Sequence, residues 1–454
     1  MLFRKKQKDL IEWIHNDENA LLITGARQVG KTYLIRETLQ NENIEFLEIN
    51  LIENPKYASM FETTLKKDIK TFVEQLSVIA NKPLAKKETI IFIDEVQECK
   101  ELITSIKFLV EEGSYKYIFS GSLLGVELTN LRSAPVGYLR VIEMFPLDLE
   151  EFLIANGLHN TFIEQLKNNF LQKTIVNEVL HEKIMDAFYK YLIVGGMPKA
   201  VSTYIATNDL ISTSLVHRDI INLYIKDFTK YEENKTLKLK LIKTYNLIPA
   251  ELNEQNKRFI FKNLDDTMKF DRYENSFNWL SSAGVALPIY NVVEPKIPLE
   301  LNKKANLFKM FLSDVGMLTT FYGRSTILKL LQRDKDINYG AVFENFIAQE
   351  LIAHGYKGYY YNSKKYGELD FVIEHLGEIL PIEVKSGKNY KIHSALNNVI
   401  DLPNYNINQS IVFSNYNVEI KNKIIYFPIY MIMFINEDLL ELPKIDPIDF
   451  SDLK

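Results

Sequence analysis

Residues 20–32 read ALLITGARQVGKT, and this stretch decides the fold of the N-terminal part of the chain. Its first five residues form an apolar run that predicts a buried strand, and the residues after Lys31 have the apolar spacing of a helix. Between them, residues 25–32 match G-x-x-x-x-G-K-[ST], the pattern of a loop whose backbone N–H groups cradle polyphosphate. We therefore predict that Lys31 reaches the β- and γ-phosphates of ATP and that the Thr32 hydroxyl binds Mg²⁺. The predicted loop contacts are Gly25, Ala26, Arg27, Gln28, Val29, Gly30, Lys31, Thr32 and Tyr33.

A second apolar run, residues 89–93, ends in the paired carboxylates Asp94 and Glu95. Downstream of a phosphate loop, this arrangement is typical of the strand that carries the metal ligand of an ATPase. We expect Asp94 to hold Mg²⁺ through water and Glu95 to polarise the attacking water.

A third apolar run, residues 115–119, ends in Ser120-Gly-Ser122. A small polar side chain at a strand tip can sense the γ-phosphate. Ser122 is the favoured candidate and Ser120 the alternative, and a simple serine turn explains the pattern equally well.

Five segments of the chain resemble the prokaryotic AAA-superfamily ATPases that carry a C-terminal domain of uncharacterised function: LLITGARQVGKT, IIFIDEVQ, YIFSGSLLG, LRSAPVGYLRVIEMFPLDLEEF and IVGGMPKAV. The resemblance implies an arginine that contacts the γ-phosphate, matched here by Arg140 or by Arg132. A surface arginine with a structural role is the alternative, because the family's compact Gly-Arg step reads Gly137-Tyr-Leu-Arg140 here. Arg218 is a third candidate, in a His-Arg-Asp triplet that lacks the asparagine of a kinase loop. The resemblance also implies that Pro198 lies against the nucleotide, with a helix terminator as the alternative.

The last third of the chain carries a second group of chemically suggestive residues. Asp370 is followed, after twelve residues, by Glu383-Val-Lys385, and Glu344 lies in an amphipathic helical pattern upstream. This spacing resembles the core of the PD-(D/E)xK nucleases. Residues i and i+2 of a strand face the same side, so Glu383 and Lys385 point together, and a hairpin brings Asp370 beside them.

The nuclease pattern has two interpretations, an active metal site or a degenerate site without metal. Asp370, Glu383 and the Val384 carbonyl would bind a divalent metal, Lys385 would orient water, and Glu344 would complete the acidic cluster. The alternative is a degenerate nuclease fold kept for binding, in which Glu383 and Lys385 form an internal ion pair.

Residues 231–298 combine helical patterns at 237–247 and 270–280 with a glycine turn into a short strand pair. This combination predicts a winged helix that binds DNA or only packs against a neighbour. We therefore expect three domains: an ATPase domain with a helical lid at 1–230, a winged helix at 231–298 and a nuclease-like domain at 299–454.

The composition describes a soluble globular chain of 454 residues, 46% hydrophobic and 25% charged. One cysteine excludes an internal disulfide, the first twenty residues do not form a signal peptide, and no apolar run is long enough to cross a membrane, so we expect a cytoplasmic protein. The longest apolar stretch, residues 426–435, reads as a buried strand. The formal charge of −5 is concentrated in residues 437–454, which hold −4, so nucleic acid stays a possible partner.

The sequence as a whole predicts an α/β chain: a parallel P-loop sheet with a helical lid, a winged helix, and a restriction-endonuclease-like α/β domain. The predicted function is Mg²⁺-dependent ATP hydrolysis that controls a C-terminal domain acting on or binding DNA or RNA. The alternative is a nucleotide-gated switch or scaffold that binds a protein partner, with a silent C-terminal domain and an oligomer as an option.

Overall fold

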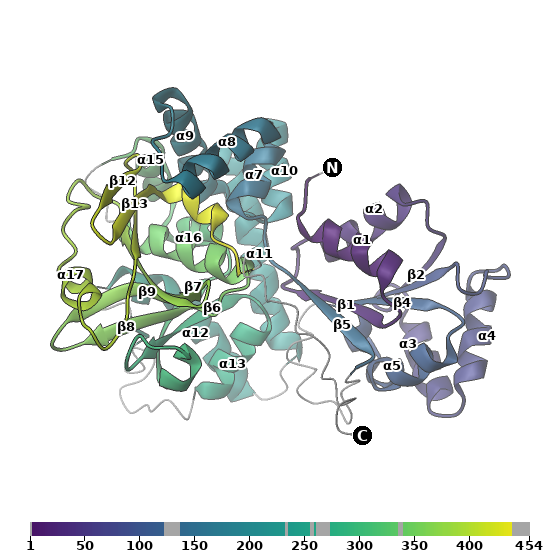
Figure 1. Cartoon of the computed structure of the whole chain (residues 1–454). Coiled ribbons are helices and arrows are strands. Elements are labelled where there is room, and N and C mark those ends of the chain that lie inside the picture. The colour runs from purple at the N-terminus through teal and green to yellow at the C-terminus, as the bar shows by residue number, and fades with distance from the viewer. Residues whose placement is uncertain are drawn as a thin grey trace, which may run out of the picture.

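The computed structural model describes residues 2–121, 137–231, 235–254, 258–259, 273–334 and 339–437. Two sheets stand at opposite ends of the molecule in Figure 1, with a layer of helices between and above them. We call the five-stranded sheet and helices α1–α5 the N-terminal module. The eight-stranded sheet with α16 and α17 is the C-terminal module.

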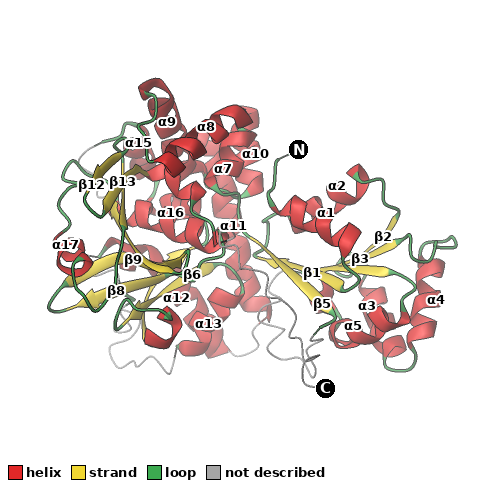
Figure 2. Ribbon diagram, in the orientation of Figure 1, coloured by secondary structure: helices red, strands yellow, loops and turns green. Residues whose placement is uncertain are grey.

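The N-terminal module is a parallel sheet covered by helices on both faces, as Figure 2 shows. Its strand order is β2-β3-β4-β1-β5, and the central strands are continuous apolar runs because both of their faces are buried. Helices α1 and α2 lie on one face and α3–α5 on the other. The bounds are α1 Lys6–Asn16, β1 Ala20–Gly25, α2 Lys31–Asn41, β2 Phe46–Asn50, α3 Pro55–Leu65, α4 Ile69–Ile79, β3 Ile90–Asp94, η1 Val96–Glu98, α5 Lys100–Glu112, β4 Lys116–Ser120 and β5 Leu139–Met144.

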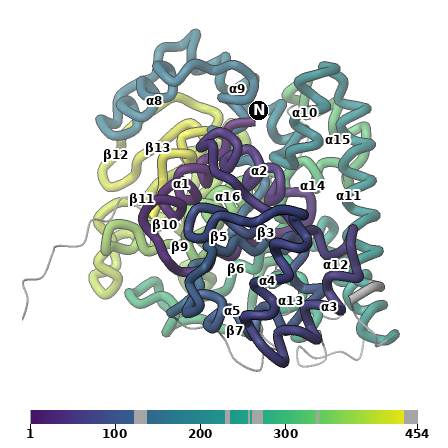
Figure 3. The backbone as a smooth tube through the Cα atoms, turned by 90° about the vertical axis from the view of Figure 1, so that its right-hand side faces the viewer, coloured from purple at the N-terminus to yellow at the C-terminus, as the bar shows by residue number. Residues whose placement is uncertain are grey.

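Helices fill the middle of the chain. Helices α10, α11, α14 and α15 gather at one side of the molecule in Figure 3, away from α8, and α10 packs along α11. The bounds are α7 Leu149–Ala155, α8 Asn160–Gln172, α9 Glu178–Val194, α10 Pro198–Thr207, α11 Leu210–Tyr231, α12 Lys235–Asn253, α13 Glu274–Ser282, α14 Val315–Tyr322 and α15 Arg324–Leu331.

The C-terminal module is a mixed sheet of eight strands in the order β12-β13-β11-β10-β9-β8-β6-β7. Helix α16, buried along most of its length, packs on one face and α17 on the other. The bounds are β6 Ala286–Val292, η4 Leu299–Asn302, β7 Lys303–Leu312, α16 Gly340–Ala353, β8 Tyr359–Ser363, β9 Gly367–His375, β10 Glu378–Lys385, α17 Ser394–Ile400, β11 Ser410–Ser414, β12 Glu419–Lys421, β13 Ile424–Pro428 and η5 Ile429–Phe434.

The winged helix predicted for residues 231–298 is not confirmed. Strand β6 pairs with β7 in an antiparallel ladder and with β8 in a parallel one, so both strands belong to the eight-stranded sheet. The boundary expected at residue 298 therefore falls between two paired strands of one sheet. Part of the predicted helical pattern, residues 260–272, lies outside the described residues.

The strand predicted for residues 426–435 is wrong over most of its length. Strand β13 ends at Pro428, and the 3-10 helix η5 follows from Ile429 to Phe434. Proline has no backbone N–H to donate to a ladder, which explains why the strand stops there despite the apolar run. None of the described helices combines the length and apolar character that a membrane crossing requires.

A single hydrophobic core joins the two modules. It contains Leu21 of β1, Phe188 of α9, Phe346 of α16 and Phe371 of β9, all of them buried. The outer faces of the two sheets have separate cores of their own. Because the central core is shared, the modules are packed together through the helices rather than strung on a linker.

Candidate functional site

The phosphate loop connects β1 to α2 and depends on two glycines. Gly25 ends β1 at φ +138°, and a Cβ there would lie 2.2 Å from the carbonyl oxygen of Met144. Gly30 is the N-cap of α2 at φ +94°, a left-handed conformation that other residues adopt at a cost. Only glycine fits these two positions, so the loop takes the shape that its motif requires.

Lys31 is the first residue of α2, and its side chain is folded back under the loop. Its Nζ donates to the carbonyl oxygens of Gly25, at 2.9 Å, and Ala26, at 2.8 Å. Burial lowers the pKa of Lys31 to about 8, although the nearby carboxylates of Glu95 and Asp94 act in the opposite direction. The amine is thus held at the centre of the loop by two backbone carbonyls, with the carboxylates of Glu95 and Asp94 nearby.

Asp94 lies at the tip of β3, where three neighbouring elements supply donors to it. The Thr32 hydroxyl donates to its Oδ2 at 3.0 Å and the Asn50 amide at 3.1 Å, while Ser120 at the tip of β4 donates to Oδ1. Hydroxyl and carboxylate oxygens are the ligands that Mg²⁺ prefers, so Thr32 and Asp94 fit the predicted metal role. Asn50 was missed from the sequence, although the parallel register pairs it with Asp94.

Glu95 follows Asp94 in a left-handed conformation, with φ of 58°. Its carboxylate accepts from the Gln97 side chain at 2.5 Å and lines the same cavity as Lys31 and Thr32. Left-handed backbone is uncommon outside glycine and is often found where a site demands it. The geometry thus turns the second acid of the pair toward the loop.

The cavity above the loop, which we call the loop cavity, has a volume of about 730 Å³. Its far wall is helix α10, which brings Pro198 within 3.5 Å of the position that a Cβ on Gly30 would take. Lys199 and Ile205 of the same helix, and Leu2 of the N-terminal segment, complete that wall. The structure therefore brings the predicted Pro198 next to the predicted loop.

Arg27 and the residues after it in the loop are fixed by helix α11. The Arg27 guanidinium pairs with Asp227 at 2.5 Å, and the Tyr224 hydroxyl donates to the Arg27 carbonyl at 2.9 Å. Gln28 follows with a positive φ of 68°. The loop is therefore held from the helical layer as well as from its own sheet.

Of the candidate arginines, the two that lie in the described residues, Arg140 and Arg218, are not among the residues that line the loop cavity. Arg140 pairs with Leu21 in the register of β1, four residues before Gly25, and its guanidinium faces Glu12 at 3.5 Å and Asp17 at 3.6 Å. Arg218 is exposed on α11. Arg132 and the favoured Ser122 lie outside the described residues.

The predicted nuclease residues meet on one side of the C-terminal sheet. Strands β9 and β10 form the expected antiparallel hairpin, and the Asp370 carboxylate accepts from the Val384 backbone N–H at 2.9 Å. Glu383 and Lys385 point together and form an ion pair of 2.6 Å. Burial, and then the charge of Asp370, raise the pKa of Glu383 to about 8, with Lys385 acting against both.

A lysine that the sequence did not reveal enters this acidic cluster. Lys309 of β7 is fully buried, 2.7 Å from a carboxylate oxygen of Glu368 and 3.7 Å from one of Glu344. Burial alone would lower the pKa of Lys309, but the charges of Glu344 and Glu368, with that of Asp370, raise it above its ordinary value. The only available signal was a lysine within the apolar run that ends β7.

The cluster is thus compensated by two lysines of the chain itself. Across the described ranges, no group of three or more His, Cys, Asp or Glu side chains is arranged to hold a metal ion. Among the predicted residues, Glu383 pairs with Lys385, Glu344 lies 3.7 Å from Lys309, and Asp370 accepts from the Val384 N–H.

Comparisons with known proteins divide the chain into three matches. Residues 17–153 match the model of a family described as an AAA domain. Residues 185–327 and 339–432 match two families described as domains of unknown function, DUF8612 and DUF4143. No curated protein matches the chain.

A solved structure, a Walker-type ATPase of Pyrococcus abyssi, is similar over 71% of this chain and 96% of its own, with 15% sequence identity. Its TM-score of 0.43 is too low for the likeness to carry an argument. The loop geometry, the five parallel strands and the AAA match together support a nucleotide-binding P-loop ATPase. The nuclease-like character of the C-terminal module is not confirmed by these matches.

Proposed function

We propose that this chain is a Mg²⁺-dependent ATPase that binds ATP at residues 25–33. One observation carries the proposal: Lys31, Thr32 and Glu95 line a single cavity, and Asp94 is bonded to Thr32 beside it. In this proposal Lys31 leaves its loop carbonyls to bind phosphate oxygens, which are the stronger acceptors.

The other side chains divide the remaining work. Thr32 and Asp94 would hold Mg²⁺, which when bound supplies charge stabilisation on the phosphates. Glu95 takes a proton from the attacking water, a role for which its position on the wall of the loop cavity is suited. Ser120 and Asn50 keep the Asp94 carboxylate in one orientation.

Nucleotide binding by the purified full-length chain tests the proposal. With Mg²⁺ present, we expect ATP to bind and Lys31→Ala to lose at least about tenfold in affinity, because a charge-assisted contact is removed. Lys199→Ala tests whether α10 contributes, and Lys167→Ala, on α8 and away from the loop cavity, is the control. Absence of ATP binding in the wild-type chain would refute the proposal.

For the C-terminal module, we propose a binding function controlled by the nucleotide state, without cleavage. The supporting observation is that Lys309 and Lys385 already neutralise the carboxylates that a nuclease would need for metal. The ligand that we favour is DNA or RNA, and a protein partner is the alternative.

A second candidate, a metal-dependent nuclease, is favoured by a different observation. Asp370 and Glu383 lie next to the paired residues Phe371 and Ile382 of the β9–β10 hairpin, and Lys385 follows two residues on. All the residue types for phosphodiester hydrolysis are present at the spacing that the pattern requires.

Cleavage and binding assays separate these candidates. Full-length protein is incubated with duplex DNA, single-stranded DNA or RNA and Mg²⁺ or Mn²⁺, with and without ATP. Cleavage that is lost in Lys385→Ala but kept in the control Lys388→Ala would establish the nuclease. Nucleotide-dependent binding without cleavage supports the favoured proposal. If the protein neither cleaves nor binds nucleic acid, the alternative of a scaffold for a protein partner is supported.

The division into domains also stays a proposal. We place the ATPase domain with its lid at residues 1–230, as the sequence predicts. We propose that β6, although it precedes the boundary predicted at residue 298, works with β7 as part of the C-terminal module, because both strands belong to its sheet.

A further inference from the structure

The side chain of Arg4 reaches the back of the phosphate loop from the N-terminal segment. It is 6% exposed, and its Nη1 donates to the Val29 carbonyl at 2.8 Å. Its Nη2 donates at 2.6 Å to the carbonyl of Phe145, the residue directly after β5. One guanidinium thus ties the loop to the segment that leaves the N-terminal sheet.

The hydrogen bond to the Val29 carbonyl restrains the peptide group that leads to Gly30, a residue that lines the loop cavity. The peptide bond between Val29 and Gly30 is trans, so the carbonyl of the first residue and the N–H of the second point in opposite directions. Fixing the Val29 carbonyl therefore fixes the direction of the Gly30 N–H, and Gly30 lines the loop cavity. Arg4 also lies 3.8 Å from the position of a Cβ on Gly30.

Arg4 is itself held by Glu151 at the start of α7. Its Nε lies 3.1 Å from Glu151 Oε2, and the other carboxylate oxygen accepts from the Lys5 backbone N–H at 2.6 Å. Glu151 also closes a capping box with Asp148. The guanidinium therefore contacts one carboxylate and two backbone carbonyls, which leaves its planar fork little freedom.

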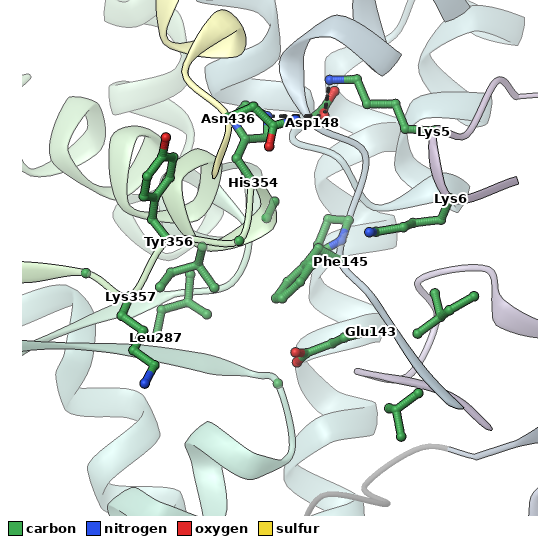
Figure 4. Close-up of a pocket in the computed structure, with 18 of the residues that line it drawn as sticks. Lys5, Lys6, Glu143, Phe145, Asp148, Leu287, His354, Tyr356, Lys357 and Asn436 are labelled. Carbon is green, nitrogen blue, oxygen red and sulfur yellow. Dashed lines mark hydrogen bonds and ion pairs between the residues drawn. The ribbon is translucent and has the colours of Figure 1, made fainter. Parts of the chain in front are cut away.

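Helix α16 of the C-terminal module contacts the same segment, residues 148–151. Glu350 accepts from the Leu149 backbone N–H at 3.1 Å, and His354 Nε2 lies 3.5 Å from Asp148. Figure 4 shows Asp148 between Lys5 on one side and His354 on the other. The Lys5 ammonium completes the contact at 2.7 Å from Asp148.

These contacts form an unbroken buried chain from α16, through residues 148–151 and Arg4, to the phosphate loop. We infer that Arg4 is a positioning residue through which the docking of α16 on residues 148–151 sets the affinity of the loop for nucleotide. This inference rests on the proposed binding of ATP at the loop. It names the route by which the C-terminal module and the nucleotide control each other, since such coupling is reciprocal.

A double-mutant cycle tests this route. The ATP dissociation constant, KM and kcat are measured for full-length wild type, Arg4→Ala, Glu350→Ala and the double variant, each below its melting temperature. Arg4→Ala should raise the dissociation constant and KM about tenfold with kcat nearly unchanged. Glu350→Ala should raise them about fivefold in the wild-type background and not at all in the Arg4→Ala background.

Two further variants serve as controls for the cycle, a conservative substitution of Arg4 and a substitution of a surface arginine. Arg4→Lys keeps the charge but not the fork, so it should recover part of the affinity, and it replaces Arg4→Ala in the cycle if that variant does not fold. Arg36→Ala removes an arginine that pairs at 2.5 Å with Glu48 on the surface of the same module, and it should leave the affinity unchanged.

The possible failures are distinguishable. Wild-type affinity in folded Arg4→Ala, or additive effects in the cycle, would overturn the inference and leave the ATPase proposal intact. If wild type binds no ATP, the proposed function itself fails.

Discussion

Lys31 is a buried amine that we propose binds phosphate. Its contacts with the Gly25 and Ala26 carbonyls stabilise the charged amine less than water does. Burial therefore lowers the pKa of Lys31 to about 8. A bound polyphosphate would add negative charge beside it and favour the protonated amine. Binding of ATP should therefore be linked to proton uptake when the pH approaches or exceeds 8.

This linkage gives a pH prediction. Above about pH 8 the free protein loses the Lys31 proton, so the affinity for ATP should fall by up to about tenfold per pH unit. Calorimetric titration in buffers of different ionisation enthalpy should detect proton uptake at pH 8.5 and much less at pH 6.5. Lys31→Arg, which stays charged, should bind more weakly but abolish the uptake, and equal uptake in that variant would contradict the assignment.

Lys309 is the second buried cation whose removal has a predictable cost. Lys309→Met leaves the Glu344 and Glu368 carboxylates without their nearest positive charge, which should cost about 3–5 kcal/mol of unfolding free energy. Lys303→Met, on the same strand and paired at 2.7 Å with the more exposed Glu300, should cost less than about 1 kcal/mol. Urea unfolding followed by circular dichroism measures both.

The same variant tests how the acidic cluster is neutralised. If Lys309 occupies the place of a divalent ion, Mn²⁺ should restore stability to Lys309→Met and have no effect on wild type. Stabilisation of the wild-type chain by Mn²⁺, to the same extent, would instead favour the nuclease candidate.

At the scale of elements, Asp314 joins a helix cap to the turn that carries Pro198. Its carboxylate accepts from the Met317 N–H at 2.9 Å as the N-cap of α14, and from the Gly196 N–H at 2.6 Å. A Cβ on Gly196 would lie 1.9 Å from the Leu147 carbonyl, so this turn is pressed against the segment after β5. One buried carboxylate thus positions the start of α10 above the phosphate loop.

Removing this cap should cost more than removing an ordinary one. Asp314→Ala should lose about 2–4 kcal/mol, because two buried N–H groups lose their acceptor. Asp68→Ala, which removes the exposed cap of α4, should lose about 1 kcal/mol. Asp314→Ala should also raise the KM for ATP, and comparable losses for the two caps would contradict this account.

Local patterns predicted the N-terminal site because each of its parts is contiguous in sequence. The strand, loop and helix around Lys31 and the acids at the end of β3 are short-range features, and so is the β9–β10 hairpin of the C-terminal module. Ser120 rather than the favoured Ser122 is the serine whose contact with Asp94 is described, and Ser122 lies outside the described residues.

Long-range pairing was beyond the reach of these patterns. Strand β6 joins β8 through the register Tyr290 to Tyr359, and nothing in the local periodicity distinguishes this from a separate winged-helix hairpin. Lys309 and Arg4 were missed for the same reason, since their partners are distant in the chain.

At the scale of the whole molecule, the N-terminal and C-terminal modules share a core and a buried set of charges. A cleft of about 890 Å³ lies between them, bordered by Lys6 and Glu143 on one side and by Leu287 and Lys357 on the other (Figure 4). Contact around residues 148–151 closes one end of this cleft. A change in the phosphate loop can therefore reach the C-terminal module through Arg4 and residues 148–151.

Phosphate release by Glu95→Gln is the decisive test of ATP hydrolysis in the loop cavity. With Mg²⁺ and saturating ATP, the variant should bind ATP within a fewfold of wild type while its turnover falls by about 100-fold or more, because a general base is removed. Glu98 is an exposed acid in the 3-10 helix η1, which Glu95 precedes, so Glu98→Gln is the matched control and should turn over normally. Unchanged phosphate release by Glu95→Gln, or an equal loss in Glu98→Gln, would contradict the account.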